Sequence, residues 1–549
     1  MNRQMFESSE LAARTRYWAL AMTRIPSVTG SRDEAAFPAR LGELIAAEPA
    51  FAAGHVSVRI IPVDGDALGR SCVALLVRGK GARTVVLTGH FDTVGIDDYA
   101  ELRDVAIEPD RLHDRLLVRL RRATHTAAER LALQDLECGD YLPGRGLLDM
   151  KAGLAAGLAL AEGFAQTDTR NGNILVLAVP DEEANSAGAR QAARSLPALA
   201  RELGLELCAA INMDSIADDG DGRAGRMVAL GSVGKLLASA LVIGRPAHAC
   251  YPLAGINAGA IAGALAAELE WSHELSDARP GVPGVPPTLL SLKDSKAHYD
   301  VTTPARVFAS WNVLTYGRSA ESILAGFAAV TGRACAAIAG RLAATAARHG
   351  GAAGPVAIRV LTVAELRDLA RQRDPQIDGQ VTRVLAAHTG PPLSIPDQCR
   401  LAMEALWQAT GLAGPAVVIG FGSMPYLPVS LGDGGNARLL AAAVEAACAE
   451  AGGRHGCSIG TTGFFPGISD VSFLGEADLA GIPVIAANTA AWREAVGWPA
   501  EGGVAGIPTI NAGPWGRDYH TPLERLHVGY GFQALPQLVG AITARVLQG

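Results

Sequence analysis

The sequence predicts an α/β protein whose buried parallel strands end in polar side chains, with a second domain inserted into the first. Four apolar runs of strand length end at histidine or acidic residues, a pattern typical of strands that carry a binding site at one edge of a sheet. A length of 549 residues is too great for one hydrophobic core. The apolar runs that end in histidine or acidic residues occur before and after the middle of the chain but not within it. We therefore expect a first domain in two parts, residues 1–232 and 431–549, around an inserted α+β domain of residues 233–430.

Composition and charge exclude several classes of protein. A hydrophobic content of 49% and a charged content of 19% are typical of a globular protein with a large core. The net charge of −7, without a long Lys/Arg run, argues against a nucleic-acid partner. Eight cysteines without a CxxC pair argue against a thiolate zinc site and against a disulfide framework, and fit a reducing compartment. No signal-like apolar segment opens the chain and no run offers ~18 uninterrupted apolar residues, so we expect no membrane segment and a cytoplasmic location.

The N-terminal part of the first domain is expected to alternate helices and strands. Ser9 could cap an amphipathic helix, and a second helix should end just before Pro49. Residues 97–140 are charged and arginine-rich, and we interpret them as a solvated excursion or a lid. A glycine-rich loop at residues 144–151 then precedes an alanine- and leucine-rich helix. The expected helices lie at residues 10–23, 33–47 and up to about 164, and the strands at 56–61, 71–77, 83–88, 173–179 and 207–213.

The remaining elements follow from the same apolar patterns. In the inserted domain we expect strands at residues 236–243, 308–314 and 416–420, and helices at 255–269, 319–349 and 363–371. After it, we expect a helix at residues 438–451, a strand at 484–487, and a run at 507–510 that leads through a Gly-Pro-rich loop to His520.

The stretch Asp181-Glu182-Glu183 directly follows one of the buried strands. Three consecutive carboxylates at such a place repel one another, and desolvation disfavours each charge. A bound cation would remove that cost, whereas a solvated acidic turn is the alternative interpretation for this stretch taken alone.

Three further apolar runs end in the same way, which favours the cation. Residues 83–89 lead into His90 and Asp92, residues 207–213 lead into Asp214, and residues 507–510 lead to His520. In an open α/β sheet, ligands bind outside the carboxyl ends of the strands. We therefore expect these side chains to form one cluster.

Histidine and carboxylate ligands without cysteine fit Zn²⁺, Mn²⁺ or Co²⁺. Five such ligands serve two ions only if one carboxylate bridges them, and Asp149, at the start of a helix, is the natural bridge. Two-metal hydrolytic sites hold their ions ~3.5–4 Å apart with a water between them. Of the pair Glu182 and Glu183, one can ligate and the other can act as general base. Asp92, two residues after His90, could orient that imidazole.

Five stretches together resemble the motif series of the M20 family of metallopeptidases and amidohydrolases. They occur in the family's order and span nearly the whole chain, and residues 280–304 with the long insertion are most similar to the arginine-utilisation subgroup called RocB. The stretches are Thr88–Val94, Gly144–Lys151, Pro180–Glu183, Asn212–Asp214 and Tyr519–Pro522.

The resemblance implies a three-layer mixed-sheet zinc-peptidase catalytic domain with an inserted α+β lid or dimerisation domain. It also implies a dinuclear zinc site. His90, Asp149 and Asp214 would hold one ion, and Asp149, Glu183 and His520 would hold the other. Asp92 would orient His90, and Glu182 would be the general base.

The resemblance extends to residues of the lid. His248 resembles a lid histidine that helps to polarise the scissile carbonyl, and Asn312 resembles a lid asparagine near the substrate, although ordinary packing is the alternative for both. Ser469-Asp470 matches a loop near the substrate, with loop capping as the alternative. Arg306 and Arg318 are candidates for holding a substrate carboxylate. The resemblance further favours a homodimer through residues 233–430, in which His248 of one subunit completes the site of the other.

These observations predict a metal-dependent hydrolase that cleaves an amide bond in a small peptide or an N-acyl amino acid. Two alternatives stay open: a deacylase or amidohydrolase of a non-peptide amide, and a protein that keeps the scaffold but only binds a ligand. The intact Glu182 argues against the last, because an inert binder has no need of a free carboxylate beside its metal ligands.

Overall fold

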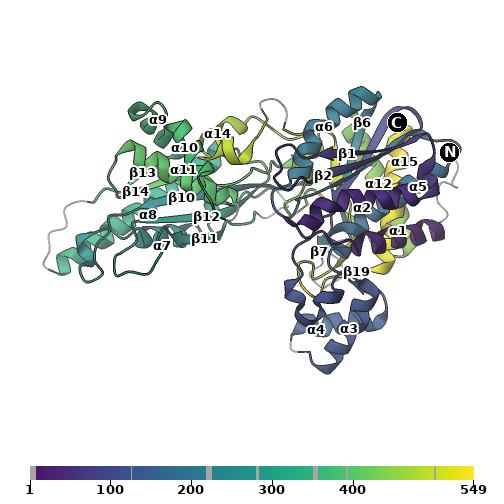
Figure 1. Cartoon of the computed structure of the whole chain (residues 1–549), viewed down its shortest axis with the longest axis horizontal. Helices are drawn as coiled ribbons and strands as arrows, with labels where there is room; N and C mark the ends of the chain where they lie inside the picture. The colour runs from purple at the N-terminus through teal and green to yellow at the C-terminus, as the bar shows by residue number, and fades with distance from the viewer. Residues whose placement is uncertain are drawn as a thin grey trace. The chain divides into compact units, whose positions relative to one another are not determined.

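The computed structural model describes residues 8–124, 126–217, 226–279, 284–349, 356–390, 393–465, 467–499 and 503–549, and these form two compact units (Figure 1). Unit 1 comprises Met1–Ser232, Val429–Ala477 and Glu501–Gly549, and unit 2 comprises Val233–Pro428 and Asp478–Ala500. The chain leaves unit 1 at β9 (Gly231–Ser232) and re-enters it at β15 (Val429–Ser430), and these two strands pair with each other.

Unit 1 is built on a mixed eight-stranded sheet with the order β1-β2-β5-β3-β6-β17-β8-β16. Its centre is parallel, because β3 pairs in parallel with β5 and β6, and β17 pairs in parallel with β6. The strands are β1 (Val56–Pro62), β2 (Ser71–Val77), β3 (Lys80–His90), β5 (Asn171–Val179), β6 (Glu206–Asn212), β8 (Met227–Ala229), β16 (Gly460–Thr462) and β17 (Thr509–Asn511).

Helices cover both faces of this sheet. Successive side chains of a strand point to opposite faces, so Val85 and Leu87 of β3 join one core and Val86 joins the other. The first core contains side chains of α1 (Ser8–Thr23), α2 (Arg32–Ala47), α5 (Ala152–Gln166), α12 (Gly435–His455) and α15 (Leu535–Gln548). The second contains side chains of α6 (Ala187–Leu203) and α13 (Val471–Leu474). The three-layer mixed-sheet prediction is thereby confirmed.

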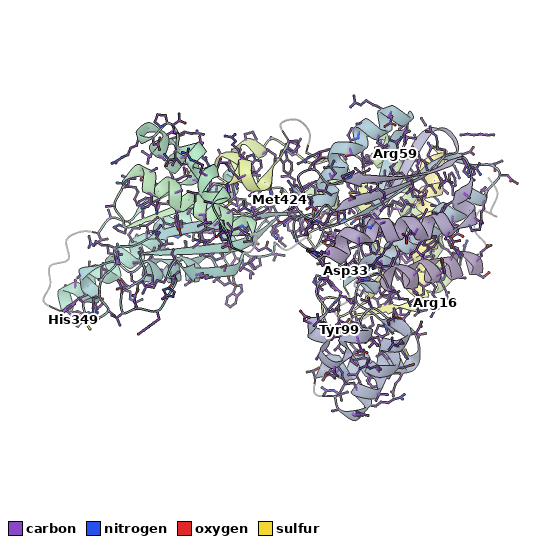
Figure 2. The ribbon with its side chains drawn as sticks, viewed as in Figure 1. Arg16, Asp33, Arg59, Tyr99, His349 and Met424 are labelled. Carbon is purple, nitrogen blue, oxygen red and sulfur yellow. The ribbon has the colours of Figure 1, made fainter. Side chains whose placement is uncertain are left out.

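Residues 97–140 are a packed helical segment of unit 1, and the interpretation as a solvated excursion is wrong. They form a 3₁₀ turn (Asp97–Val105), α3 (Pro109–Arg122) and α4 (Ala127–Cys138). Leu112, Leu116 and Leu120 recur at every fourth position of α3 and are buried, so the arginines occupy the other side of an amphipathic helix. Tyr99, labelled in Figure 2, is also fully buried. The segment contacts a small sheet of β4 (Tyr141–Pro143), β19 (Arg525–His527), β18 (Trp515–Arg517) and β7 (Ile216–Ala217).

Unit 2 is an α+β unit with a five-stranded sheet of the order β11-β12-β10-β14-β13. The strands are β10 (Gly234–Ile243), β11 (Thr288–Asp294), β12 (Arg306–Thr315), β13 (Arg359–Thr362) and β14 (Ala416–Phe421). The helices are α7 (Ala258–Leu269), α8 (Ala320–Arg348), α9 (Val363–Arg373), α10 (Ile377–Ala386), α11 (Ile395–Thr410) and α14 (Ile482–Ala487).

Three local predictions are wrong. The expected strand at residues 484–487 is the helix α14, because a short apolar run does not distinguish strand from helix and Pro483 is preorganised for the first helical turn. The segment Asp478–Ala500 that contains it groups with unit 2, whereas we expected it in the second part of the first domain. Ser9 lies inside α1, so it is not the cap of that helix.

Helix α8 is, within the described ranges, long and apolar enough by length and composition to cross a membrane, with a mean hydropathy of 1.6 over its most apolar window. Its N-terminal half buries Ile323, Phe327 and Val330, and α8 packs against α7, β13 and β14. One such helix is weak evidence for a membrane segment, because helices in the core of other proteins pass the same test of length and composition.

Candidate metal centre

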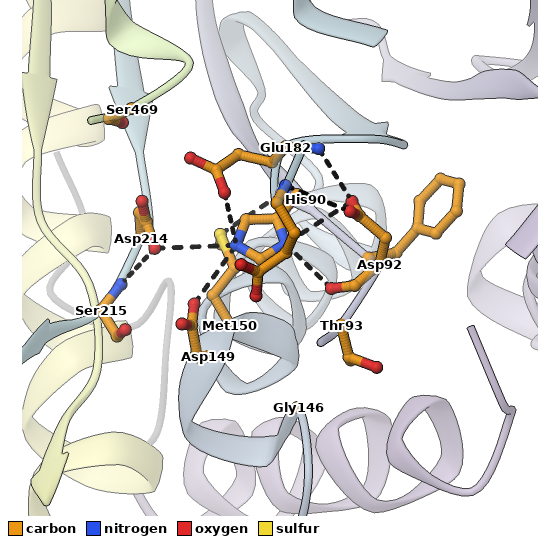
Figure 3. Close-up of polar contacts among 12 residues, drawn as sticks. His90, Asp92, Thr93, Gly146, Asp149, Met150, Glu182, Asp214, Ser215 and Ser469 are labelled. Carbon is orange, nitrogen blue, oxygen red and sulfur yellow. Dashed lines mark hydrogen bonds and ion pairs between the residues drawn. The ribbon is translucent and has the colours of Figure 1, made fainter. Parts of the chain in front are cut away.

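The predicted cluster is assembled at the carboxyl ends of four adjacent strands of unit 1. β5, β3, β6 and β17 are neighbours in the sheet and run in the same direction. β3 ends at His90, β5 ends directly before the turn of Glu182 and Glu183, and β6 ends two residues before Asp214. Figure 3 shows the side chains of His90, Glu182 and Asp214 converging beside Asp149.

Two groups of candidate ligands share Asp149. The ligand atoms of His90, Asp149 and Asp214 all lie within 4.8 Å of one another, as do those of Asp149, Glu183 and His520. His90 Nε2 is 3.2 Å from Asp149 Oδ1 and 3.8 Å from Asp214 Oδ1. His520 Nε2 is 3.1 Å from both Asp149 Oδ2 and Glu183 Oε1. Asp149 therefore presents one oxygen to each group, which is the arrangement that a bridging carboxylate requires.

The donor set fits divalent cations. Imidazole nitrogens and carboxylate oxygens without thiolates suit Zn²⁺, Mn²⁺ or Co²⁺. His90, Asp149 and Asp214 are buried, and buried carboxylates are costly unless positive charge compensates them. Burial opposes ionisation of Asp149, yet hydrogen bonds from His520 and His90 lower its pKa. Burial raises the pKa of Asp214 to about 6 despite its hydrogen bond with His90, so this carboxylate lacks full compensation from the protein.

The loop that carries Asp149 is irregular and tightly packed. Leu147–Lys151 is buried, Asp149 has non-helical backbone angles of φ −113° and ψ 95°, and the peptide bond between Asp149 and Met150 is cis. Met150 fills the space beside Gly89, where a Cβ atom would lie 1.9 Å from the Met150 methyl carbon. A side chain at position 89 would therefore displace the Met150 side chain from β3.

Glu182 is half-buried at the edge of the first ligand group. Its Oε2 lies 3.8 Å from His90 Nε2, beyond hydrogen-bond distance. Burial raises the pKa of Glu182 well above its usual value, His90 opposes that rise, and Asp214 and Asp470 add to it. A carboxyl with a raised pKa is suited to accept and return a proton near neutral pH.

Asp92 is buried behind the cluster and organises the turn that carries both glutamates. Its carboxylate accepts the backbone N–H groups of Glu182 (3.2 Å) and Glu183 (3.3 Å), and the hydroxyl of Thr29 (2.8 Å). His90 Nδ1 lies 3.0 Å from the backbone oxygen of Asp92 and 3.7 Å from its Oδ1. The closest partner of Nδ1 in this residue is thus the carbonyl, which leaves Nε2 facing Asp149.

Asp181, the first residue of the acidic stretch, is separated from the cluster by an ion pair. Its carboxylate pairs with the guanidinium of Arg70 and accepts the N–H of Ala187 at 3.1 Å. Arg70 also pairs with Glu34 and Asp66. Burial raises the pKa of Asp181 and Arg70 opposes that rise, so the ion pair offsets part of the cost of this carboxylate. Of the other two, Glu183 belongs to the second ligand group and Glu182 lies beside the first.

Several supporting residues were not found from the sequence. Asn511 Oδ1 accepts the N–H of Asp214 at 3.2 Å, and its Nδ2 donates to the Asp214 carbonyl at 2.9 Å. Glu524 accepts the N–H groups of Gly146 and Asp149. Asn511 directly follows the apolar run of residues 507–510, so its position could have indicated a role, whereas no local pattern marks Glu524.

The remaining predicted residues of unit 1 lie near the cluster. Ser469 Oγ accepts a hydrogen bond at 3.0 Å from Asn212, which lies two residues before Asp214 in the chain. Asp470 is buried, and burial raises its pKa to about 7.

The residues predicted to contact the substrate from unit 2 differ in their exposure and in their partners within that unit. His248 is exposed, and its Nδ1 accepts the N–H of Cys250 at 3.1 Å. Asn312 lies in β12 opposite Leu237 and Thr288, and its buried Oδ1 has no hydrogen-bond partner among the described residues. Arg306 pairs with Glu404 at 3.5 Å, and Arg318 donates to the carbonyl of Glu274 and to Ser322.

Comparisons with known proteins agree with this geometry. The model of peptidase family M20/M25/M40 matches residues 132–490. The chain is 28% identical to the uncharacterised protein YqjN of Bacillus subtilis, over 96% of this chain and 95% of that protein. It is also 28% identical to the protein RocB of Bacillus subtilis, over 98% of this chain and 95% of that protein.

Solved structures share the fold at low identity. A tripeptidase from Staphylococcus aureus superposes with a TM-score of 0.54 at 15% identity, covering 98% of this chain and 99% of that one. An M20 family metallo-carboxypeptidase from Sulfolobus solfataricus superposes with a TM-score of 0.52 at 11% identity, covering 97% and 99%.

The fold and the acid- and histidine-lined centre define a hydrolase of the metallopeptidase class. Because the family model covers more than half of the chain, the chain belongs to peptidase family M20/M25/M40 and is an enzyme of that family.

Proposed function

We propose that the protein is a dinuclear metal-dependent hydrolase that cleaves an amide bond in a small peptide or an N-acyl amino acid. The observation that carries this proposal is the pair of overlapping ligand groups that share Asp149, with the half-buried carboxylate of Glu182 beside them. His90, Asp149 and Asp214 would hold one ion, and Asp149, Glu183 and His520 the other, with Zn²⁺ the preferred cation and Mn²⁺ or Co²⁺ the alternatives.

Divalent cations at these ligands would supply Lewis-acid activation of the attacking water and of the substrate carbonyl. Glu182 would take one proton from the water as its oxygen bonds to the carbonyl carbon. The same carboxyl would then give that proton to the amide nitrogen as the carbon–nitrogen bond breaks, which releases a carboxylic acid and an amine. Asp92 would hold the orientation of His90 and the turn of Glu182, as its contacts with both support.

His248 would donate a hydrogen bond to the substrate carbonyl, where negative charge develops. Its Nδ1 already accepts the Cys250 N–H, so the neutral imidazole carries its proton on Nε2 and can donate from there. We propose that this histidine acts across a homodimer formed through residues 233–430. Exposed Leu290 and Leu292 on the edge strand β11 support pairing with a second copy, because an exposed apolar edge strand is a template for strand addition.

Asn312 is proposed to contact the substrate, since its buried Oδ1 lacks a partner among the described residues. We further propose a cytoplasmic location, because all eight cysteines are free and lie in the described ranges. A role in arginine utilisation is proposed on the similarity to RocB.

The test is a screen of dipeptides and N-acyl amino acids with purified protein of known metal content, with and without a chelator. We expect turnover of at least one class, its loss on metal removal, and its recovery when Zn²⁺, Mn²⁺ or Co²⁺ is restored. Hydrolysis that survives complete metal removal would overturn the proposal. Stoichiometric metal without turnover of any amide would favour a ligand-binding protein.

A further inference from the structure

Glu524 contacts the backbone of the loop that carries Asp149. Its Oε1 accepts the N–H of Gly146 at 2.9 Å and the N–H of Asp149 at 3.4 Å. Because the loop is irregular, these N–H groups have no helical partners of their own, and buried N–H groups without an acceptor are costly. The carboxylate therefore takes the place of a regular hydrogen-bond ladder at the shared ligand.

Arg145 fixes the other oxygen of that carboxylate. Its Nη1 donates to Glu524 Oε2 at 2.7 Å, and both side chains are 1% exposed. The Nε of Arg145 donates to the Gly95 carbonyl at 3.2 Å, and its Nη2 donates to Asp98 Oδ2 at 3.0 Å. Asp98 belongs to the helical segment 97–140, and the backbone N–H of Arg145 also donates to Ala106 of this segment at 2.9 Å.

The chain connects Glu524 to the second ligand group as well. Glu524 follows His520 by four residues, and its carbonyl accepts the N–H of Gly144 at 3.3 Å. The next residue, Arg525, pairs with Pro143 between β19 and β4. One buried side chain thus ties the loop of His520 to the loop of Asp149, and Arg145 ties both to the helical segment.

We propose that Glu524 is a positioning residue that sets the backbone of Asp149 for metal binding, and that Asp98 of the helical segment 97–140 supports it through Arg145. This inference rests on the proposed function, because it requires that Asp149 binds a metal ion. It assigns a role to the helical segment 97–140, which would stabilise the position of the loop that carries Asp149.

The test measures Zn²⁺ binding by the apoprotein in competition with a chromophoric chelator. Glu524→Gln keeps the size of the side chain but removes the charge that faces Arg145. We expect its dissociation constant for Zn²⁺ to rise by about 10- to 100-fold, as is typical when a residue that orients a metal ligand is changed. Asp98→Asn, at the more exposed end of the chain of contacts, should raise the constant by less, in the same direction.

Asp104→Asn is the matched control. Asp104 lies in the same 3₁₀ turn as Asp98, but it pairs with Arg115 at the surface, so Zn²⁺ affinity should not change. Thermal melting of each apoprotein provides a second readout, since a merely structural role would lower the melting temperature and leave the affinity of the folded protein unchanged. Wild-type affinity in folded Glu524→Gln would overturn the inference. If that variant does not fold, equal affinities of Asp98→Asn and Asp104→Asn would overturn it.

A wild-type apoprotein that binds no Zn²⁺, Mn²⁺ or Co²⁺ would instead refute the proposed function. The two failures are therefore distinguishable, because one concerns the difference between variants and the other concerns the wild-type protein itself.

Discussion

The two units of the molecule differ in how they meet the charge of buried carboxylates. In unit 2, the buried carboxylate among the described residues is that of Asp277, and it accepts the backbone N–H groups of Tyr316, Gly317 and Arg318 at 2.7–2.8 Å. Burial opposes its ionisation, but these hydrogen bonds lower its pKa below the usual value. The charge of Asp277 is thus met by the protein alone.

In unit 1, the strand ends gather carboxylates that the protein does not fully compensate. Asp214, Glu182 and Asp470 all have raised pKa values because they are buried near one another. Buried carboxylates without full compensation by positive charge or hydrogen bonds lower the stability of a fold. The difference supports the proposal that the carboxylates of unit 1 hold an external cation and serve in proton transfer.

The largest effect is expected for Asp149→Ala. Removal of the carboxylate shared by both ligand groups should abolish binding of both ions and therefore turnover, because each group is left with two ligands. Elemental analysis and activity assays measure this outcome, with the exposed Asp110→Ala as control. Unchanged metal content in Asp149→Ala would refute the bridging role.

The next effect is expected for Glu182→Gln. The variant should keep its metal and its fold but lose turnover by ~10²–10⁴-fold, since glutamine is close to isosteric and cannot accept the proton. Steady-state kinetics alongside metal analysis measure this, with the exposed Glu202→Gln as control. Near-normal kcat would reassign the base. The next candidate for the base is Asp181, which directly precedes Glu182 and pairs with Arg70, and Asp181→Asn would test it.

A smaller loss is expected for His248→Ala, which tests whether unit 2 contributes to the chemistry. Loss of one hydrogen-bond donor to the developing charge should lower kcat by ~10²–10³-fold and leave the metal content intact. Mixing His248→Ala with Glu182→Gln protein under subunit exchange should restore part of the activity, because one site of each mixed dimer has both residues. Confirmed exchange without recovery would refute the arrangement across a dimer.

The smallest effect on catalysis is expected for Asp277→Ala. This variant tests whether the buried carboxylate of unit 2 contributes to stability and not to metal binding. Three backbone N–H groups would lose their acceptor, so the free energy of unfolding should fall by about 1–3 kcal/mol. Metal content and the kcat of the folded enzyme should stay at wild-type values. Chemical denaturation measures the free energy of unfolding, and elemental analysis measures the metal content. Loss of metal in this variant would contradict the distinction between the buried carboxylates of the two units.

The sequence by itself determined the residues of the centre and most of the elements that carry them. Period-two and period-3.6 apolar patterns are local properties, and the carboxyl ends of adjacent parallel strands must lie at one edge of a sheet. For that reason His90, Glu183 and Asp214 could be assigned to one cluster from their places after apolar runs. The same reasoning failed at residues 484–487, where a four-residue apolar run carries no usable period.

Tertiary structure alone decided how the centre is supported. Arg70 pairs with Asp181, Asp92 holds the turn of the two glutamates, and Glu524 holds the loop of Asp149. These contacts join residues 90 to 375 positions apart in the chain. No local pattern encodes such contacts, because any buried carboxylate needs a donor but the sequence does not say which. The helical segment 97–140 shows the same limit: its arginines predicted exposure, while the packing of its leucines placed it beside the metal ligands.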